Sequence, residues 1–330
     1  MSYNIYIGIA LGDQAGISSE IVAKALLESH EGYTPIIFGN YDLFCKNSSC
    51  QIEVEFLDTF TRENLGNNIY FVDIPAGNDI ETGEITPDSG KLIYDSLKTA
   101  IDFQKNGLID AIIMAPITKQ ALHDAGLKYT SEFEIFQDMY NTQGCRAVIR
   151  CENIFRATVV GHCAFREIPD KLTTEGIIQT AESLYSVVST FKPNKQCTLA
   201  VAALNPHAGE NGLFGDEESR IISPAIDTLN ERGISCSGPW PADTVFLRAV
   251  DGKDDGVVFL YHDQGNIAMK SKFFGDGVLI YTNIPAVICS VGHGSALDIA
   301  GKGTANAQNM ISCIDTAVEI CKKRRHNNEQ

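Results

Sequence analysis

The sequence has few positive charges and no long apolar segment. Its 330 residues include 26 Lys and Arg against 42 Asp and Glu, a formal net charge of −16 at pH 7. Such a surface repels nucleic acid and anionic membranes, so we expect neither as a partner. No apolar run reaches the roughly eighteen residues of a membrane span, and the first residues lack the basic region of a signal peptide. We therefore expect a cytoplasmic protein that acts on small molecules.

Clustered cysteines are also missing. The ten cysteines are scattered singly through apolar segments, as at Cys197, Cys289 and Cys313. Disulfide frameworks occur in short, loop-rich secreted chains, and structural zinc sites need four ligands. Cys45 and Cys50 lie close together, but no second pair of zinc-binding spacing accompanies them. The pattern predicts reduced, buried thiols.

Neither common nucleotide-binding motif is present. The glycine-rich stretch HGSALDIAGKGTAN, residues 293–306, has neither the GxGxxG pattern nor its strand-turn-helix spacing. The loop LGDQAGISSE, residues 11–20, lacks the Lys-Ser/Thr ending of a P-loop. A nucleotide cofactor would therefore need another binding mode.

What the sequence does contain is an alternation of short β-branched apolar runs with longer amphipathic segments, which is typical of α/β proteins with a parallel sheet. The predicted strands cover residues 5–11, 34–40, 110–116, 156–162, 197–205, 256–262 and 286–292. The predicted helices begin near Ser18, Asp88, Thr173, Glu217 and Met310. A chain of this length suits two domains, although no linker or change of composition marks a boundary between them.

Three histidines, His162, His207 and His262, each follow an apolar strand-like run. Ligands of open parallel sheets bind at the carboxyl ends of the strands, so three imidazoles placed there can converge on one metal ion. Nearby Asp263 and Gln264 could hold a second ring nitrogen. Each histidine taken alone could equally be a hydrogen-bonded residue at a strand end. Imidazole ligands favour zinc, cobalt or nickel over magnesium or manganese, and zinc is our first choice.

Two further residues are candidates for proton transfer, and one for binding an anion. Lys119 follows an apolar strand and opens a short helix; positive neighbours would let it exchange a proton near neutral pH, or it is a surface lysine. Asp243 follows a Pro-rich turn, as a carboxylate at the same centre or as a helix cap. Lys270 is a cation suited to a carboxylate or phosphate.

Seven segments of the chain match one known family in order. They are GDQAGISSEI, APITKQALHDAG, GHCAFREIPDKLT, LNPHAGENGLFGDEE, GPWPADTVF, YHDQGNIAMK and HGSALDIAGKGTAN. Together they resemble the 4-hydroxythreonine-4-phosphate dehydrogenase (PdxA) family over nearly the whole chain. The resemblance implies a two-domain α/β/α subunit of the isocitrate/isopropylmalate dehydrogenase-like type with its active site in the interdomain cleft. Residues 1–125 and 295–330 would form the first domain, and 126–294 the second.

The resemblance also implies a homodimer with shared active sites. His162 and His207 of one subunit and His262 of the other would hold one divalent metal ion. That ion would bind the substrate hydroxyl as a Lewis acid. Lys119 or Asp243 would receive the proton.

A second likeness concerns the cofactor. The segment that begins at His293 resembles the adenosine-binding loop of the isopropylmalate and isocitrate dehydrogenase superfamily. On that likeness, His293, Asp298 and Asn306 contact the adenosine of NAD. We expect NAD rather than NADP, because Asp298 at the ribose would repel a 2′-phosphate.

The sequence departs from the family pattern in the substrate pocket. The family's substrate-binding His-Thr pair falls on Glu132 and Phe133, and its Asn and Arg fall on Leu279 and Ile288, whereas Lys270 is retained. Arg is the natural bidentate ligand of phosphate, so these changes weaken the expected phosphate grip. We therefore expect a hydroxy acid other than 4-phospho-hydroxythreonine, less phosphorylated, more hydrophobic or cationic.

The predicted activity is an NAD-dependent, metal-dependent oxidation of a secondary alcohol in a small hydroxy acid. Decarboxylation would follow if a carboxylate lies β to the new ketone. Three alternatives stay open: a genuine 4-hydroxythreonine-4-phosphate dehydrogenase, an acyl or phosphoryl transferase, and a catalytically inactive binder of the same fold.

Overall fold

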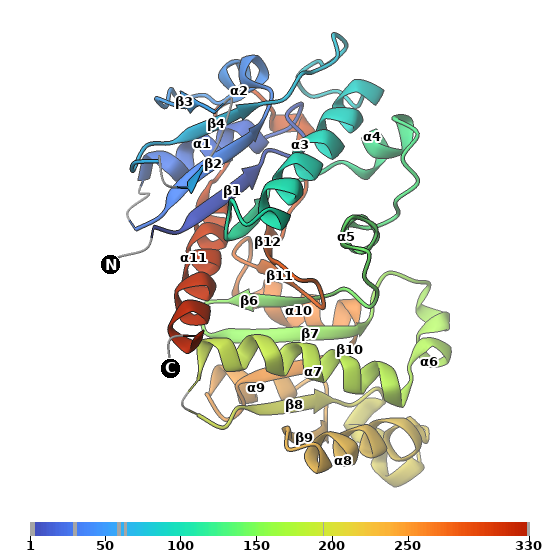
Figure 1. Ribbon diagram of the computed structural model, residues 1–330. Coiled ribbons are helices and arrows are strands. Elements are labelled where there is room, and N and C mark those ends of the chain that lie inside the picture. Colours follow the sequence, from blue (N-terminus) through green and yellow to red (C-terminus); the bar gives the residue numbers. More distant parts are fainter. Residues whose placement is uncertain (1–3, 29–31, 58–60, 63–64, 194, 329–330) are drawn as a thin grey trace. The chain divides into compact units, whose positions relative to one another are not determined.

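The chain forms two compact α/β units (Figure 1). Unit 1 comprises Met1–Cys145 and Ile284–Gln330, and unit 2 comprises Arg146–Asn283. The expected domain boundaries, after residues 125 and 294, both fall inside unit 1. The computed structural model describes residues 4–28, 32–57, 61–62, 65–193 and 195–328.

The sheet of unit 1 is parallel throughout, with strand order β3-β4-β2-β1-β5-β12. Its strands are β1 (Tyr6–Ala10), β2 (Thr34–Gly39), β3 (Glu55–Phe56), β4 (Tyr70–Asp73), β5 (Ala111–Met114) and β12 (Val287–Val291). Every residue of β1, β5 and β12 is buried. Continuous apolar runs are what a sheet covered on both faces requires.

Helices cover both faces of this sheet. The helices of unit 1 are α1 (Ser18–Glu28), α2 (Tyr41–Asn47), α3 (Pro87–Lys105), α4 (Lys119–Asp124), α5 (Glu132–Tyr140) and α11 (Gln308–Asn328). Helix α3 packs on β1, β2 and β5, whereas α11 packs on β5 and β12 and on α1. Figure 1 shows α3 and α11 on opposite sides of the strands. A capping box of Thr86 and Ser89 begins α3.

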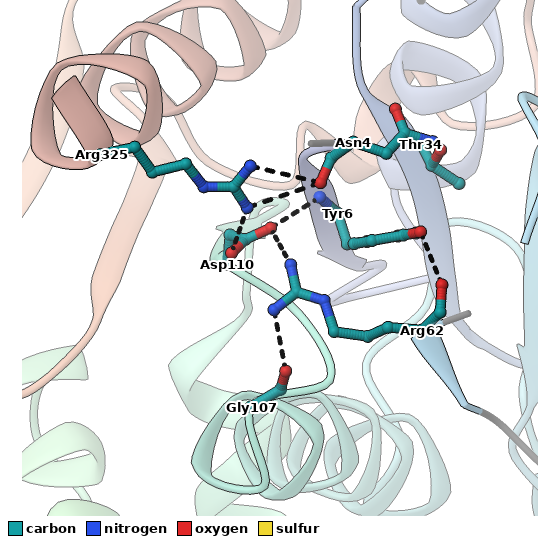
Figure 2. Close-up of polar contacts among 7 residues, drawn as sticks. All are labelled: Asn4, Tyr6, Thr34, Arg62, Gly107, Asp110 and Arg325. Carbon is teal, nitrogen blue, oxygen red and sulfur yellow. Dashed lines mark hydrogen bonds and ion pairs between the residues drawn. The ribbon is translucent and has the colours of Figure 1, made fainter. Parts of the chain in front are cut away.

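The amino-terminal edge of this sheet is held by ion pairs around Asp110, which directly precedes β5 (Figure 2). Its carboxylate accepts a hydrogen bond from the Tyr6 backbone N at 2.9 Å. It also pairs with Arg62 at 2.5 Å and with Arg325 of α11 at 2.8 Å. The cluster therefore ties β1, β5 and α11 together at the amino-terminal edge of the strands.

Unit 2 contains a mixed sheet of order β11-β6-β7-β10-β8-β9. Its strands are β6 (Arg146–Cys151), β7 (Ile154–Val160), β8 (Thr198–Ala202), β9 (Ser235–Trp240), β10 (Gly256–Tyr261) and β11 (Val278–Thr282). Strand β6 is antiparallel to β7 and β11, and the other pairs are parallel.

The helices of unit 2 are α6 (Ile168–Lys171), α7 (Thr174–Phe191), α8 (Ser223–Glu231), α9 (Val245–Val250) and α10 (His262–Lys272). Both α7 and α10 pack on β7 and β10. In Figure 1, α7 lies in front of these strands and α10 behind them. Phe155 of β7 packs on Phe191 of α7, with ring centroids 5.1 Å apart, as is usual for aromatic pairs. Since side chains alternate along a strand, the neighbouring positions of β7 face α10.

All ten cysteines are free thiols, seven of them buried. In the part of the chain that the structure describes, no helix is long and apolar enough to cross a membrane.

Candidate active site

The three candidate histidines lie at one edge of unit 2. His162, His262 and His207 follow the carboxyl ends of β7, β10 and β8, which are neighbouring parallel strands. The strand-end placement expected from the sequence is therefore found. This edge is where open parallel sheets bind ligands.

His162 and His262 are in direct contact. Their ring centroids are 4.7 Å apart and the rings are inclined by 48°. Two imidazoles bound to one tetrahedral ion at about 2.1 Å would have centroids on the order of 5 Å apart. Asp263 Oδ1 lies 2.7 Å from His262 Nδ1, an arrangement that leaves the other ring nitrogen for a metal. The donor set thus fits two ligands of a metal site.

His207 does not join this pair. Among the described residues, no three His, Cys, Asp or Glu side chains are placed to hold a metal ion together. The family resemblance implied that His162 and His207 act in one subunit and His262 in the other. In the structure, His262 lies beside His162 of the same chain.

The loop that carries His207 has an unusual backbone. Residues 207–211 all have positive φ, from 42° at Glu210 to 77° at Gly209. A non-glycine residue in this region costs roughly 1–2 kcal/mol, so surrounding contacts must hold the loop. The buried Glu218 carboxylate accepts hydrogen bonds from the backbone N of Leu204 at 2.9 Å and of Asn205 at 2.7 Å. Glu218 is a supporting residue that the sequence did not single out, although it lies in a matched segment.

Asp243 and Lys270 are exposed in unit 2. Within the described residues, neither makes a hydrogen bond or ion pair with the three histidines. Asp243 lies in the turn between β9 and α9, and the N-cap of α9 is the next residue, Thr244. The alternative role of Asp243 as that helix's cap is therefore not observed.

In unit 1, Lys119 and Glu132 form an ion pair. Lys119 Nζ lies 3.5 Å from Glu132 Oε2, with the side chains 42% and 23% exposed. They are the first residues of α4 and α5. The neighbour of Lys119 is thus a carboxylate rather than the positive groups expected from the sequence. Phe133, beside Glu132, is half-buried.

A buried acid links three loops at the carboxyl edge of the unit 1 sheet. Asp13, after β1, accepts hydrogen bonds from Thr118 Oγ1 and from the Ala15 backbone N at 3.1 Å. Thr118 Oγ1 also lies 2.8 Å from Ser295 Oγ, after β12. Burial raises the pKa of Asp13, and the hydrogen bonds from Thr118, Ala15 and Ser295 lower it in part. Thr118 directly precedes Lys119, the first residue of α4. The hydrogen-bond network therefore fixes the position at which this helix begins.

The predicted adenosine-binding residues lie in the segment between β12 and α11. The Asp298 carboxylate has no partner among the described residues, which leaves it available for a ribose hydroxyl. Asn306 Oδ1 already accepts a hydrogen bond from Gln308 N at 2.8 Å, at the start of α11. His293 Nδ1 lies 3.0 Å from Gly294 O. Asp298 therefore fits the cofactor role best.

Two predicted substrate residues lie within strands. Leu279 is half-buried in β11. Ile288 has no exposed surface in β12, so a substrate could touch it only if its neighbours moved. The structure gives no support for Ile288 in the substrate pocket.

The fold and these residues define an α/β enzyme with imidazoles and a lysine-carboxylate pair at the carboxyl edges of parallel strands. The chain belongs to the PdxA family: the model described as "Pyridoxal phosphate biosynthetic protein PdxA" matches residues 31–317. The family resemblance and the α/β fold class predicted from the sequence are confirmed. The chain is a dehydrogenase acting on CH-OH, which implies a nicotinamide cofactor. The transferase and inactive-binder alternatives are not retained.

The chain is similar to known dehydrogenases over nearly its full length. D-threonate 4-phosphate dehydrogenase of Salmonella typhimurium is 35% identical over 325 residues, 95% of this chain and 98% of the relative. 4-hydroxythreonine-4-phosphate dehydrogenase of Beijerinckia indica is 34% identical over 323 residues, 95% and 94%. The crystal structure of 4-hydroxythreonine-4-phosphate dehydrogenase from Klebsiella pneumoniae has a TM-score of 0.85 and 31% identity, covering 97% of this chain and 98% of that one.

Proposed function

We propose that this chain oxidises the secondary alcohol of a small phosphorylated hydroxy acid with NAD and one divalent metal ion, and that the substrate is not 4-phospho-hydroxythreonine. The names of its relatives support a phosphorylated hydroxy acid. The observation that carries the choice of substrate is the ion pair of Lys119 and Glu132. A compound of the D-threonate 4-phosphate type fits this pair.

The two phosphorylated substrates differ at C2, where threonate has a hydroxyl and hydroxythreonine an ammonium group. A hydroxyl can donate to Glu132 and accept from Lys119. An ammonium group has no lone pair and is repelled by Lys119, while the Glu132 charge is already compensated. The pair therefore favours the hydroxyl.

In this proposal the charged Lys119 first passes a proton to Glu132, and the neutral amine then receives the proton of the reacting alcohol. Asp243 is the alternative acceptor. His162 and His262 hold the metal ion, with zinc preferred and cobalt, nickel, magnesium or manganese possible, and His207 is the third ligand. The Asp298 carboxylate binds the adenosine ribose of NAD. When bound, the metal supplies a Lewis acid and NAD a hydride acceptor.

The carbon balance gives a second product to look for. Oxidation of D-threonate 4-phosphate at C3 forms a ketone β to the carboxylate, with NAD reduced to NADH. Loss of CO2 then leaves dihydroxyacetone phosphate. We also propose that the chain forms a homodimer in which the second subunit completes the active site.

The test is NADH formation with D-threonate 4-phosphate, D-threonate and 4-phospho-hydroxythreonine, each with zinc, magnesium or manganese. We expect kcat/KM for D-threonate 4-phosphate to exceed that for 4-phospho-hydroxythreonine by about tenfold or more, equivalent to ~1.4 kcal/mol. D-threonate lacks the phosphate group, so its use as a substrate tests the expectation that the protein binds phosphate weakly. Equal or better use of 4-phospho-hydroxythreonine would instead support the second candidate, the activity named for the Beijerinckia indica and Klebsiella pneumoniae relatives.

A further inference from the structure

Arg156, in β7, is a buried cation without an acidic partner in the described chain. Its exposed surface is 3%. Nη1 donates a hydrogen bond to Thr158 Oγ1 at 2.7 Å, Nη2 donates to Asn266 Oδ1, and Nε has no partner among the described residues. Burial lowers the pKa of Arg156 to about 10. A charge buried without a counter-ion costs free energy, so stability alone does not account for this arginine.

The contacts of Arg156 lead to α10, which carries His262. On that helix, His262 and Asn266 are four residues apart and therefore share a face. Asn266 meets Arg156 of β7, and His262 meets His162, which follows the same strand. The helix and the strand are thus joined at two points, of which one is the candidate metal pair.

Apolar packing holds α10 only weakly. Of its eleven residues, Gly265 and Met269 are the buried ones. Gln264 ties the first turn to Ala203 O at 2.8 Å, on the side of β8. The Arg156 contact is the corresponding polar tie to β7.

Gly265 shows how closely the helix approaches this guanidinium. A Cβ added at Gly265 would lie 3.0 Å from Arg156 Nη1 and 3.0 Å from Phe259 Cδ2. A larger residue would push the helix or the arginine away. The close contact and the hydrogen bond to Asn266 therefore act together in setting the distance between α10 and β7.

We propose that Arg156 is a positioning residue that holds α10 over β7, so that His262 lies beside His162. The inference rests on the proposed function in one respect, the role of these two histidines as metal ligands. Its geometric part, the placement of one ring beside the other, can be tested without metal.

The main variant is Arg156→Met, which keeps much of the side-chain length and removes the charge. Because a buried unpaired charge is lost, we expect the melting temperature of the metal-free full-length protein to stay the same or rise. We expect zinc affinity, measured by competition with a chromophoric chelator, to fall by about tenfold or more. Asn266→Ala should also weaken zinc binding, and the double variant should lose little beyond Arg156→Met alone.

Arg150→Met is the matched control. Arg150 lies on the neighbouring strand β6, with its guanidinium 4.2 Å from the ring centroid of Phe191, on the α7 side. Its removal should leave zinc affinity unchanged. A purely structural role of Arg156 predicts the reverse of the expected pattern, a lower melting temperature with unchanged zinc affinity, and that result would overturn the inference.

Ring-proton NMR of the metal-free protein separates this inference from the proposed metal site. If Arg156 positions α10, the His162 and His262 signals shift in Arg156→Met and not in Arg150→Met. Unchanged signals contradict the positioning role whether or not zinc binds. Zinc affinity that survives in both His162→Ala and His262→Ala contradicts the metal site alone, and the NMR result then decides the inference about Arg156.

Discussion

At the scale of single residues, a substitution of Lys119 distinguishes a defect in the chemical step from a defect in cofactor binding. In Lys119→Met we expect kcat to fall by roughly 10²–10⁴-fold, because a general base is lost, while the Kd for NAD stays unchanged. Stopped-flow NADH formation and NAD titration measure the two quantities. Lys91→Met, at an exposed lysine of α3 in the same unit, is the control. A kcat near that of the unmodified protein would assign the proton to Asp243.

Asp13 gives a prediction about pH. Its folded-state pKa is raised above the ordinary 3.8 by burial, so folding disfavours the ionised form. The stability that the protonated form contributes is complete below 3.8 and is lost as pH rises through the raised value. The free energy of unfolding of Asp13→Asn should therefore improve relative to the unmodified protein as pH rises from 3.8 to neutrality. Urea unfolding across this range checks it, and a constant difference would contradict it.

Ile288 is a position where the sequence comparison and the structure disagree. Matching it to the family's phosphate-binding Arg placed it in the substrate pocket, yet it has no exposed surface. Ile288→Arg would bury an unpaired guanidinium, and we expect the free energy of unfolding to fall by about 3–5 kcal/mol. Leu279→Arg, at a half-buried site, should cost less. A urea midpoint unchanged by Ile288→Arg would restore the pocket assignment.

At the scale of elements, the sequence predicted seven strands with apolar runs, but it missed β11, which is also an apolar run, and several strands with weaker patterns. All seven predicted strands correspond to β1, β2, β5, β7, β8, β10 and β12. The missed β6 carries Arg146 and Arg150, and the missed β9 contains Gly-Pro. Helix α10 escaped notice because two buried positions give no period of 3.6. Glu218 accepts hydrogen bonds from Leu204 and Asn205, just before the left-handed loop at His207, and the local sequence does not reveal these contacts.

Gly265 in α10 offers a prediction in which two effects oppose each other. Alanine raises helix propensity by about 1 kcal/mol over glycine. Overpacking against Arg156 and Phe259, each 3.0 Å from the new Cβ, costs typically 1–3 kcal/mol. We expect Gly265→Ala to lower the melting temperature, measured by calorimetry. Ser271→Ala, at an exposed position of the same helix, should not lower it. A gain in stability for Gly265→Ala would mean that the Arg156 side chain moves away from the new Cβ at little cost in free energy.

At the scale of the whole molecule, the chain length and the family resemblance predicted two α/β units, and the apolar runs before the three histidines predicted their strand-end positions. They did not predict which side chains meet. The Lys119–Glu132 pair joins the starts of two helices, and the His162–His262 contact joins a strand end to a helix start. The first contact depends on how two successive helices pack, and the second on the packing of elements far apart in the sequence.

The same contact predicts how subunits share the site in a homodimer. If His162 and His262 bind one ion from the same chain, as their 4.7 Å separation indicates, mixing inactive His162→Ala with inactive His262→Ala restores nothing, because each chain lacks one ligand. If His262 comes from the other subunit, half of the randomly mixed dimers have one intact site, so about a quarter of full activity returns. Mixing after reversible dissociation, followed by NADH formation, measures it. His207→Ala mixed with His262→Ala then locates His207: restored activity places it in the other subunit, and no activity places all three ligands in one chain.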